Sequence, residues 1–276
     1  MNARIARRLP AWLIRWLVRG RTAAYLIAEP VDRVGLWLNR KTRLPPLWLR
    51  RYVGPPETFE TAAAEFLCLL KLRAGLRADS AVLDIGCGCG ALAIQLLDYL
   101  GPHGRYFGFD VHQPSVRWCQ VHIAKPGFSF RWVDVHNATY NPHGDIGPEQ
   151  IRLSEQAPFD VVIAKSLFTH VTPDVMRAYM RLGSETLSLS GTFVFTAFLF
   201  RDARAPEVTQ RFPFGNDHFR HAYAHRVESA VAYGEQSVMQ ILNETGLKLS
   251  QIYPGAWRND IDPISFQDVI LVQRQL

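Results

Sequence analysis

Three alternating glycines, Gly86, Gly88 and Gly90, follow the apolar stretch 81–85 and precede a run with helical spacing. Glycine lets the backbone turn sharply and lets a ligand approach the main chain without interference from a Cβ atom. The start of the helix that follows adds free N–H groups. Because ligands of parallel α/β sheets bind at the carboxyl edge of the strands, we expect this loop to hold a nucleotide-like ligand.

Three carboxylates within or just after apolar runs narrow the choice of ligand. The glycines alone do not, because Gly86, Gly88 and Ala91 also fit the loose GxGxx(G/A) pattern of dinucleotide binding. Asp110 ends the next apolar run, where a carboxylate can accept hydrogen bonds from both hydroxyls of a ribose. Asp84, inside the run before the glycines, would repel a pyrophosphate but suits a ligand that carries an amino group and a sulfonium. Asp134 is placed to accept from an adenine amino group.

Strand-like and helix-like runs alternate around these residues, which predicts βαβ crossovers and a parallel sheet. A turn-rich link, "YPGAWRNDIDP", joins the last two strands without a helix, so we expect them to be antiparallel neighbours. The expected strands are 81–85, 105–110, 128–133, 159–164, 191–199, 247–253 and 265–273, and the expected helices are 58–74, 89–100, 114–124, 172–188 and 235–245.

These residues together resemble the class I S-adenosylmethionine-dependent methyltransferases over about residues 58–274. The resemblance is carried by "VLDIGCGCG", "FGFD", "VDV", "FDVVIAKSLFTHV" and the final strand pair. It implies a Rossmann-like, doubly wound seven-stranded sheet with its last strand antiparallel, and S-adenosylmethionine over the glycine loop. The cofactor-binding residues that it implies are Asp84, Gly86, Cys87, Gly88, Gly90, Asp110, Val111, Asp134, Val135 and Lys165.

His170, in the stretch after the fourth strand, is the candidate general base. It resembles the histidine of the "EVLEHV" stretch in ubiquinone-type O-methyltransferases, where carboxylates accompany it. Ser166 and Thr169 stand in their place here, so we predict no metal at this position. The alternative is a histidine that only orders the loop.

Two further groups of metal-ligating residue types stand outside this pattern. Cys87 and Cys89 form a lone CxC without a second pair, which is weak evidence for a zinc site. His218, His221 and His225 would share one face if residues 201–232 were helical there. We expect that inserted segment, which is also rich in phenylalanine and arginine, to act as a lid with contacts to the methyl acceptor.

The basic charge of the chain is concentrated at its N-terminus. Residues 1–51 hold 12 Lys and Arg against Glu29 and Asp32, whereas the rest holds 19 basic and 23 acidic residues. We therefore expect a basic helical extension over residues 1–54 and a methyltransferase domain over 55–276. Trp12, Leu13, Trp16 and Leu17 would share one side of the first helix. Such an extension can act as a lid, a homodimer contact or a contact with an anionic membrane surface.

The predicted function is methylation of a hydroxyl on a small molecule or glycan. Four scattered cysteines favour a reducing, cytoplasmic location, with peripheral membrane contact as an addition to it. The sequence does not favour a nucleic-acid partner, because the [DNS]PP[YFW] signature of DNA amino methylation is absent after strand four, where "AKSL" stands. Two alternatives stay open: a nicotinamide-dependent oxidoreductase, and a membrane-surface or partner-binding protein with a relict fold. An RNA methyltransferase is a minor third, favoured if the basic N-terminal face lies beside the mouth of the active site.

Overall fold

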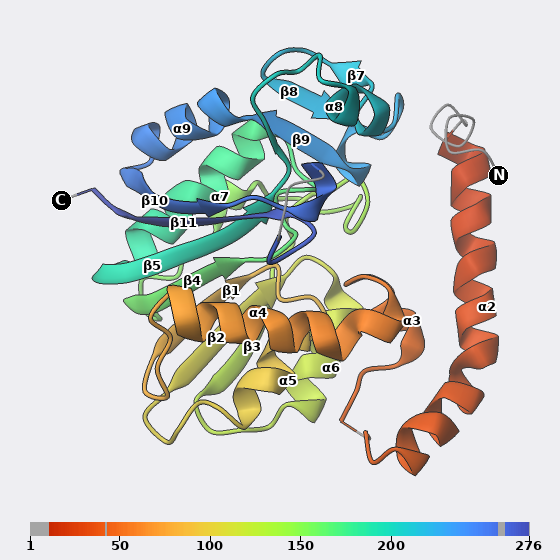
Figure 1. Cartoon of the computed structure of the whole chain (residues 1–276). Helices are drawn as coiled ribbons and strands as arrows, with labels where there is room; N and C mark the ends of the chain where they lie inside the picture. Colours follow the sequence, from red (N-terminus) through yellow and green to blue (C-terminus); the bar gives the residue numbers. More distant parts are fainter. Residues whose placement is uncertain (1–10, 42, 259–262, 276) are drawn as a thin grey trace.

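The computed structural model describes residues 11–41, 43–258 and 263–275, with side chains described from residue 23 onward. A seven-stranded sheet forms its centre, in the order β10-β11-β5-β4-β1-β2-β3 (Figure 1). β11 pairs antiparallel with both β5 and β10, whereas the strands from β5 to β3 are parallel. The strands are β1 Ala81–Ile85, β2 Arg105–Asp110, β3 Phe128–Trp132, β4 Phe159–Ala164, β5 Leu187–Ala197, β10 Leu247–Tyr253 and β11 Asp268–Arg274.

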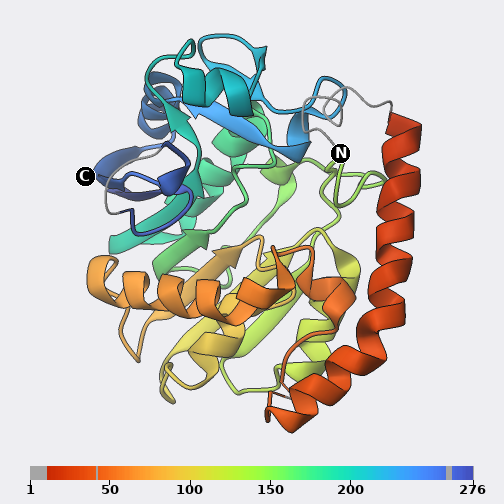
Figure 2. The same cartoon turned by 45° about the vertical axis from the view of Figure 1, so that its right-hand side comes forward.

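Helices cover both faces of this sheet, as a doubly wound fold requires (Figures 1 and 2). Neighbouring residues of a strand point to opposite faces. Val82 accordingly packs in a core with α4, α5 and α6, whereas Leu83 packs in a core with α7 and α9. The helices are α4 Phe59–Arg73, α5 Ala91–Leu97, α6 Gln113–His122, α7 Pro173–Thr186 and α9 Glu235–Glu244. The predicted fold class is confirmed.

Two helices precede the sheet. α2 (Ala11–Leu38) is long and stands beside the body, and the short α3 (Leu47–Arg50) is the element that it mainly packs against (Figure 2). The helical nature of the N-terminal region is thus confirmed. Its predicted apolar side over residues 12–17 lies outside the described side chains. In the described part of the chain, no helix is both long and apolar enough to cross a lipid bilayer.

The inserted segment is not the helix that we expected around its histidines. It contributes to a second sheet, in the order β6-β9-β8-β7. His221 lies in a strand that pairs with β9, and His218 and His225 lie in turns outside any helix. The prediction that His218, His221 and His225 share one face of a helix is therefore wrong. The elements are β6 Leu199–Phe200, α8 Pro206–Arg211, β7 Phe214–Gly215, β8 Phe219–His221, the short 3-10 helix η3 Val227–Ser229, and β9 Val231–Gly234.

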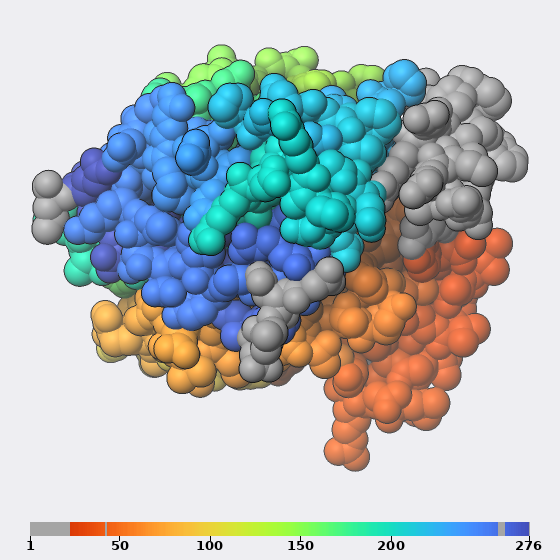
Figure 3. Space-filling view, turned by 45° about the horizontal axis from the view of Figure 1, so that its top comes forward, coloured from red at the N-terminus to blue at the C-terminus, as the bar shows by residue number. Residues whose placement is uncertain are grey.

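This second sheet has its own small core. Phe198, Phe200, Phe212 and Trp257 are buried together there, so Phe212 of the inserted segment packs against aromatic residues from outside it. Asp268, at the start of β11, joins the two sheets: its buried carboxylate accepts hydrogen bonds from the Leu199 and Gly255 backbone N–H groups and from the Trp257 indole. In the space-filling view the segment (teal to light blue) forms a continuous surface beside the blue C-terminal strands (Figure 3).

Candidate active site

A cavity of about 140 Å³ lies at the carboxyl edge of the parallel strands. The loops after β1, β2, β3 and β4 all reach it, as expected for neighbouring parallel strands whose ends meet at one edge. Its walls include eight predicted site residues: Gly86, Cys87, Gly88, Asp110, Val111, Val135, Lys165 and His170.

The glycine loop between β1 and α5 has the backbone that its sequence requires. Gly86, Gly88 and Gly90 have φ values of 80°, 55° and 79°, which side chains rarely allow. A Cβ atom on Gly88 would lie 2.9 Å from Cγ2 of Val53, and one on Gly90 would lie 2.7 Å from Cδ1 of Ile123. At Gly86 and Gly88 the loop therefore presents main chain to the cavity.

Asp110, at the end of β2, places a buried carboxylate at the cavity. Its two oxygens accept from the Gly88 and His112 backbone N–H groups, each at 2.8 Å. Burial raises the pKa of Asp110, and these N–H groups oppose the rise. A carboxylate has about four acceptor positions, so two bonds leave capacity for the hydroxyls of a ribose.

Asp84 lies behind the glycine loop and is not part of the cavity wall. It shares its face of the sheet with Tyr106, whose hydroxyl donates to Oδ2 of Asp84 at 2.7 Å. Burial raises the pKa of Asp84 to about 6, the Tyr106 hydrogen bond opposes the rise, and the charge of Asp110 adds to it. Asp84 and Asp110 thus supply two carboxylates on this side of the site, opposed by the charge of Lys165, and carboxylates suit a cationic ligand better than a pyrophosphate.

Gly90 and Asp134 also lie outside the cavity wall. Gly90 is the N-cap of α5. Asp134 follows β3, and its Oδ1 accepts from the side-chain amide of Asn141 at 3.0 Å, which ties down the loop that carries Val135. The predicted adenine contact of Asp134 stays a prediction.

Aromatic residues that sequence reasoning missed close the cavity from the other side. The Tyr52 ring lies 4.3 Å from that of His112 and 6.2 Å from that of Tyr140. Burial, with a contribution from the charge of Arg51, lowers the pKa of His112 to about 4, so its ring is neutral near pH 7. Tyr52 follows α3, and nothing in its local sequence indicates this place. His112 could have been found from its position two residues after Asp110.

His170 and Lys165 lie in the wall between this cavity and a second one of about 500 Å³. Burial lowers the pKa of Lys165, and the carboxylates of Asp84 and Glu65 oppose this effect. Ser166, between the two cavities, has a φ of 59°, held in place by a 2.7 Å hydrogen bond from its N–H to Oγ1 of Thr196. A non-glycine residue in this conformation is strained, which is typical of functional sites.

The His170 ring is oriented by the inserted segment. Nδ1 lies 3.2 Å from the carbonyl oxygen of Glu228 in η3, and a carbonyl only accepts, so Nδ1 carries a proton. In the neutral ring Nε2 then holds the free lone pair. Burial lowers the pKa of His170, with the Glu228 and Ser229 carbonyls opposing, so the neutral ring is favoured. The Glu228 carboxylate also accepts from the Ala138 N–H at 2.8 Å, which fixes η3 against the loop after β3.

Comparison with known proteins assigns the family. A family model described as "Methyltransferase domain" matches residues 76–246, more than half of the chain. The chain belongs to this methyltransferase family. S-adenosylmethionine is thus its cofactor, and the site fits that group. The main chain at Gly86 and Gly88 allows close approach, the Asp110 carboxylate suits the ribose, and the two carboxylates suit the cationic groups of the cofactor.

Individual similarities to other methyltransferases are distant. The chain is 31% identical over 75 residues to a protein of Thermoplasma acidophilum named as a probable cobalt-precorrin-6B C(15)-methyltransferase (decarboxylating). That match spans only 35% of the relative and 27% of this chain. The methyltransferase CcbJ of Streptomyces caelestis has a similar fold, with a TM-score of 0.52 and 18% identity over 81% of this chain and 92% of that one. Mitomycin 7-O-methyltransferase MmcR also has a similar fold, with a TM-score of 0.55 and 14% sequence identity. That comparison covers 85% of this chain and 58% of MmcR.

Within the described residues no three His, Cys, Asp or Glu side chains are grouped as metal ligands. The Cys87 and Cys89 side chains are both buried, and burial raises the pKa of each thiol, so these cysteines remain protonated thiols near pH 7. The aromatic residues of the inserted segment line neither of the two cavities. The aromatic rings of the second cavity come instead from α4 and from the link before β11.

Proposed function

We propose that this protein transfers the methyl group of S-adenosylmethionine to a hydroxyl of a small molecule or glycan, with His170 as the general base. The main support for this proposal is the position of His170, which lies in the wall shared by the two cavities and whose Nδ1 is held by the Glu228 carbonyl. A hydroxyl must lose its proton as it attacks, and a neutral histidine with Nε2 available is suited to take that proton.

Cofactor binding falls to the residues of the first cavity. Asp110 would hold the ribose hydroxyls, Val111 and Val135 would contact the adenine, and the backbone of Gly86 to Gly88 would lie against the methionine part. When bound, S-adenosylmethionine supplies a methyl carbon on a sulfonium, which is already a good leaving group. The contribution of the protein is then alignment of the acceptor and removal of its proton.

The second cavity supports a small acceptor. A volume of about 500 Å³ lies within the range usual for small-molecule pockets. Phe59, Phe66 and Phe266 give it apolar walls, and Thr196 and Gln267 add polar groups that can orient a hydroxylated molecule. Aromatic rings also suit the apolar face of a sugar, so both acceptor classes remain in the proposal.

The test compares His170→Asn with wild type on a panel of hydroxylated small molecules and glycans. The Asn amide can still donate to the Glu228 carbonyl but cannot act as a base. We expect the turnover rate to fall by roughly 10²–10⁴-fold, with adenosylhomocysteine affinity unchanged. His103→Asn, at an exposed position, is the matched control and should retain the wild-type rate. Turnover by His170→Asn close to that of wild type would refute the role of His170.

A further inference from the structure

Within its described side chains, helix α2 exposes a row of apolar residues on the side that faces away from the body. Ile27, Val31, Val34 and Leu38 follow a 4-3-4 spacing, which places them on one face. Their exposed fractions are 79%, 77%, 57% and 68%. Trp37, 69% exposed, borders this apolar face. A helix on the surface of a globular protein normally turns its apolar face inward, and contiguous exposed apolar patches mark interaction sites.

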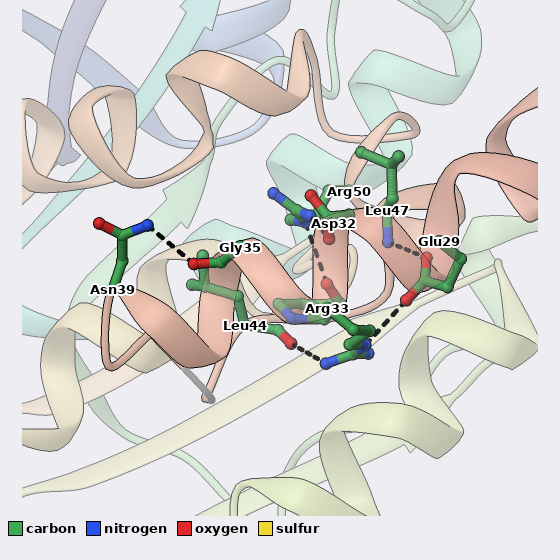
Figure 4. Close-up of polar contacts among 9 residues, drawn as sticks. Glu29, Asp32, Arg33, Gly35, Asn39, Leu44, Leu47 and Arg50 are labelled. Carbon is green, nitrogen blue, oxygen red and sulfur yellow. Dashed lines mark hydrogen bonds and ion pairs between the residues drawn. The ribbon is translucent and has the colours of Figure 1, made fainter.

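The inward face of α2 combines the apolar contact of Leu36 with ion pairs and hydrogen bonds. The Glu29 carboxylate accepts from the Arg33 Nε at 2.8 Å and from the Leu47 backbone N–H at 2.6 Å (Figure 4). Asp32 pairs with Arg50, whose side chain is only 5% exposed. The orientation of α2 is thus determined by these contacts, and the apolar face is left outward as a consequence.

The same contacts remove negative charge from the outer surface of this region. Residues 1–51 contain 12 Lys and Arg, and Glu29 and Asp32 are their only acids. Both acids are paired on the inner side of α2. Four of the basic residues, Arg33, Lys41, Arg43 and Arg50, are themselves ion-paired. Twelve basic residues against two acids still leave residues 1–51 with an excess of positive charge, which a partner of the apolar face must tolerate or attract. A second copy of this chain would bring two such regions together and be repelled.

We propose that the outward face of α2 docks this protein on an anionic lipid bilayer. The helix lies in the plane of the interface, with Ile27, Val31, Val34 and Leu38 at the boundary of headgroups and acyl chains. Basic side chains of residues 1–51 attract the anionic headgroups. Trp37 is suited to the same depth, because its ring is apolar and its N–H is polar.

The docking helix is continuous with the cofactor site. The Arg51 guanidinium lies 5.8 Å from the ring centre of Tyr25 on α2 and 4.4 Å from that of Tyr52. Tyr52 is itself part of the wall of the first cavity. A bilayer on the outward face of α2 is therefore separated from Tyr52 and Val53 by α2 and its contact with Arg51.

Vesicle flotation of the full chain tests this proposal without any assumption about methyl transfer. The probes are vesicles of phosphatidylcholine alone and of phosphatidylcholine mixed with phosphatidylglycerol. We expect binding to the mixed vesicles that weakens as salt is raised, and little binding to phosphatidylcholine alone. Absence of binding to the mixed vesicles at low salt would overturn the proposal.

The variant I27S/V31S/V34S removes most of the apolar face. Its matched control, L72S/V121S/L189S, changes side chains that are 78%, 71% and 70% exposed elsewhere. We expect the first variant to lose roughly tenfold or more in vesicle affinity, the control to bind as wild type, and both to melt as wild type. Equal binding by the two variants would overturn the proposal. A dimer of the wild-type protein that the first variant disrupts and the control does not would also overturn the proposal, because the apolar face would then bind a second copy of the chain.

Discussion

Replacing Asp84 by Asn should stabilise the protein near neutral pH while it weakens cofactor binding. Asp84 is 4% exposed, and its carboxylate has one side-chain hydrogen bond, from the Tyr106 hydroxyl. Burial raises its pKa from 3.8 to about 6. The folded protein therefore binds this proton more tightly than the unfolded chain does, and the ionised form opposes folding.

The magnitude follows from the shift in pKa. Below pH 3.8 both states are protonated and Asp84 costs nothing; as the pH rises the unfolded chain releases its proton first, and stability falls. With 1.36 kcal/mol per pKa unit, the loss grows from about 0.5 kcal/mol at pH 4 to about 3 kcal/mol at pH 7. Asn cannot ionise and its amide oxygen can still accept from Tyr106. We expect Asp84→Asn to recover about 1–3 kcal/mol at pH 7 and almost nothing at pH 4.

Urea unfolding of wild type and Asp84→Asn between pH 4 and pH 8 measures this difference. Calorimetry with adenosylhomocysteine then shows whether affinity falls as stability rises. Asp98→Asn, which changes an 84% exposed carboxylate, is the control and should leave stability within about 0.5 kcal/mol. A destabilised Asp84→Asn at pH 7, or a gain that does not change with pH, would refute the reasoning.

Three further outcomes are expected. Gly90→Ala should lose about 2 kcal/mol in urea unfolding, because φ is 79° and the added Cβ lies 2.7 Å from Ile123 Cδ1 and 3.0 Å from Cys119 Sγ; unchanged stability would contradict this. Arg50→Met should lose about 2–3 kcal/mol, because Asp32 is left largely buried without its partner, and limited proteolysis should then cut α2 first. In a pH profile, turnover should fall only when the pH drops below 6.5, the ordinary pKa of histidine, because burial lowers the pKa of His170; a fall that begins above that value would point to another base.

The large sheet could be predicted from the sequence because each strand and helix in it carries its own periodic signal. The end of β1 at Ile85 and the antiparallel pairing of β10 with β11 agree with the expectation. Differences arise where context overrides local pattern. β5 begins at Leu187 rather than at residue 191, since Leu187 pairs with Phe159 of β4.

The inserted segment could not be predicted because its order depends on distant partners. Arg220 and His221 become a strand by pairing with Ala232 and Val231 in β9, which no helical or alternating pattern around them indicates. The same holds for Glu228, whose carbonyl orients the His170 ring from 58 residues away. The place of Asp110 at the end of β2 could be predicted from the parallel order of the strands, whereas Val135 was implied only by the resemblance.

Calorimetric titration with adenosylhomocysteine and, separately, with NAD tests the central claim most directly. We predict that adenosylhomocysteine binds the wild-type protein with micromolar affinity, that Asp110→Ala abolishes this binding without unfolding the protein, and that NAD does not bind. Binding of NAD, or adenosylhomocysteine binding that survives Asp110→Ala at full affinity, would contradict the site described for this methyltransferase.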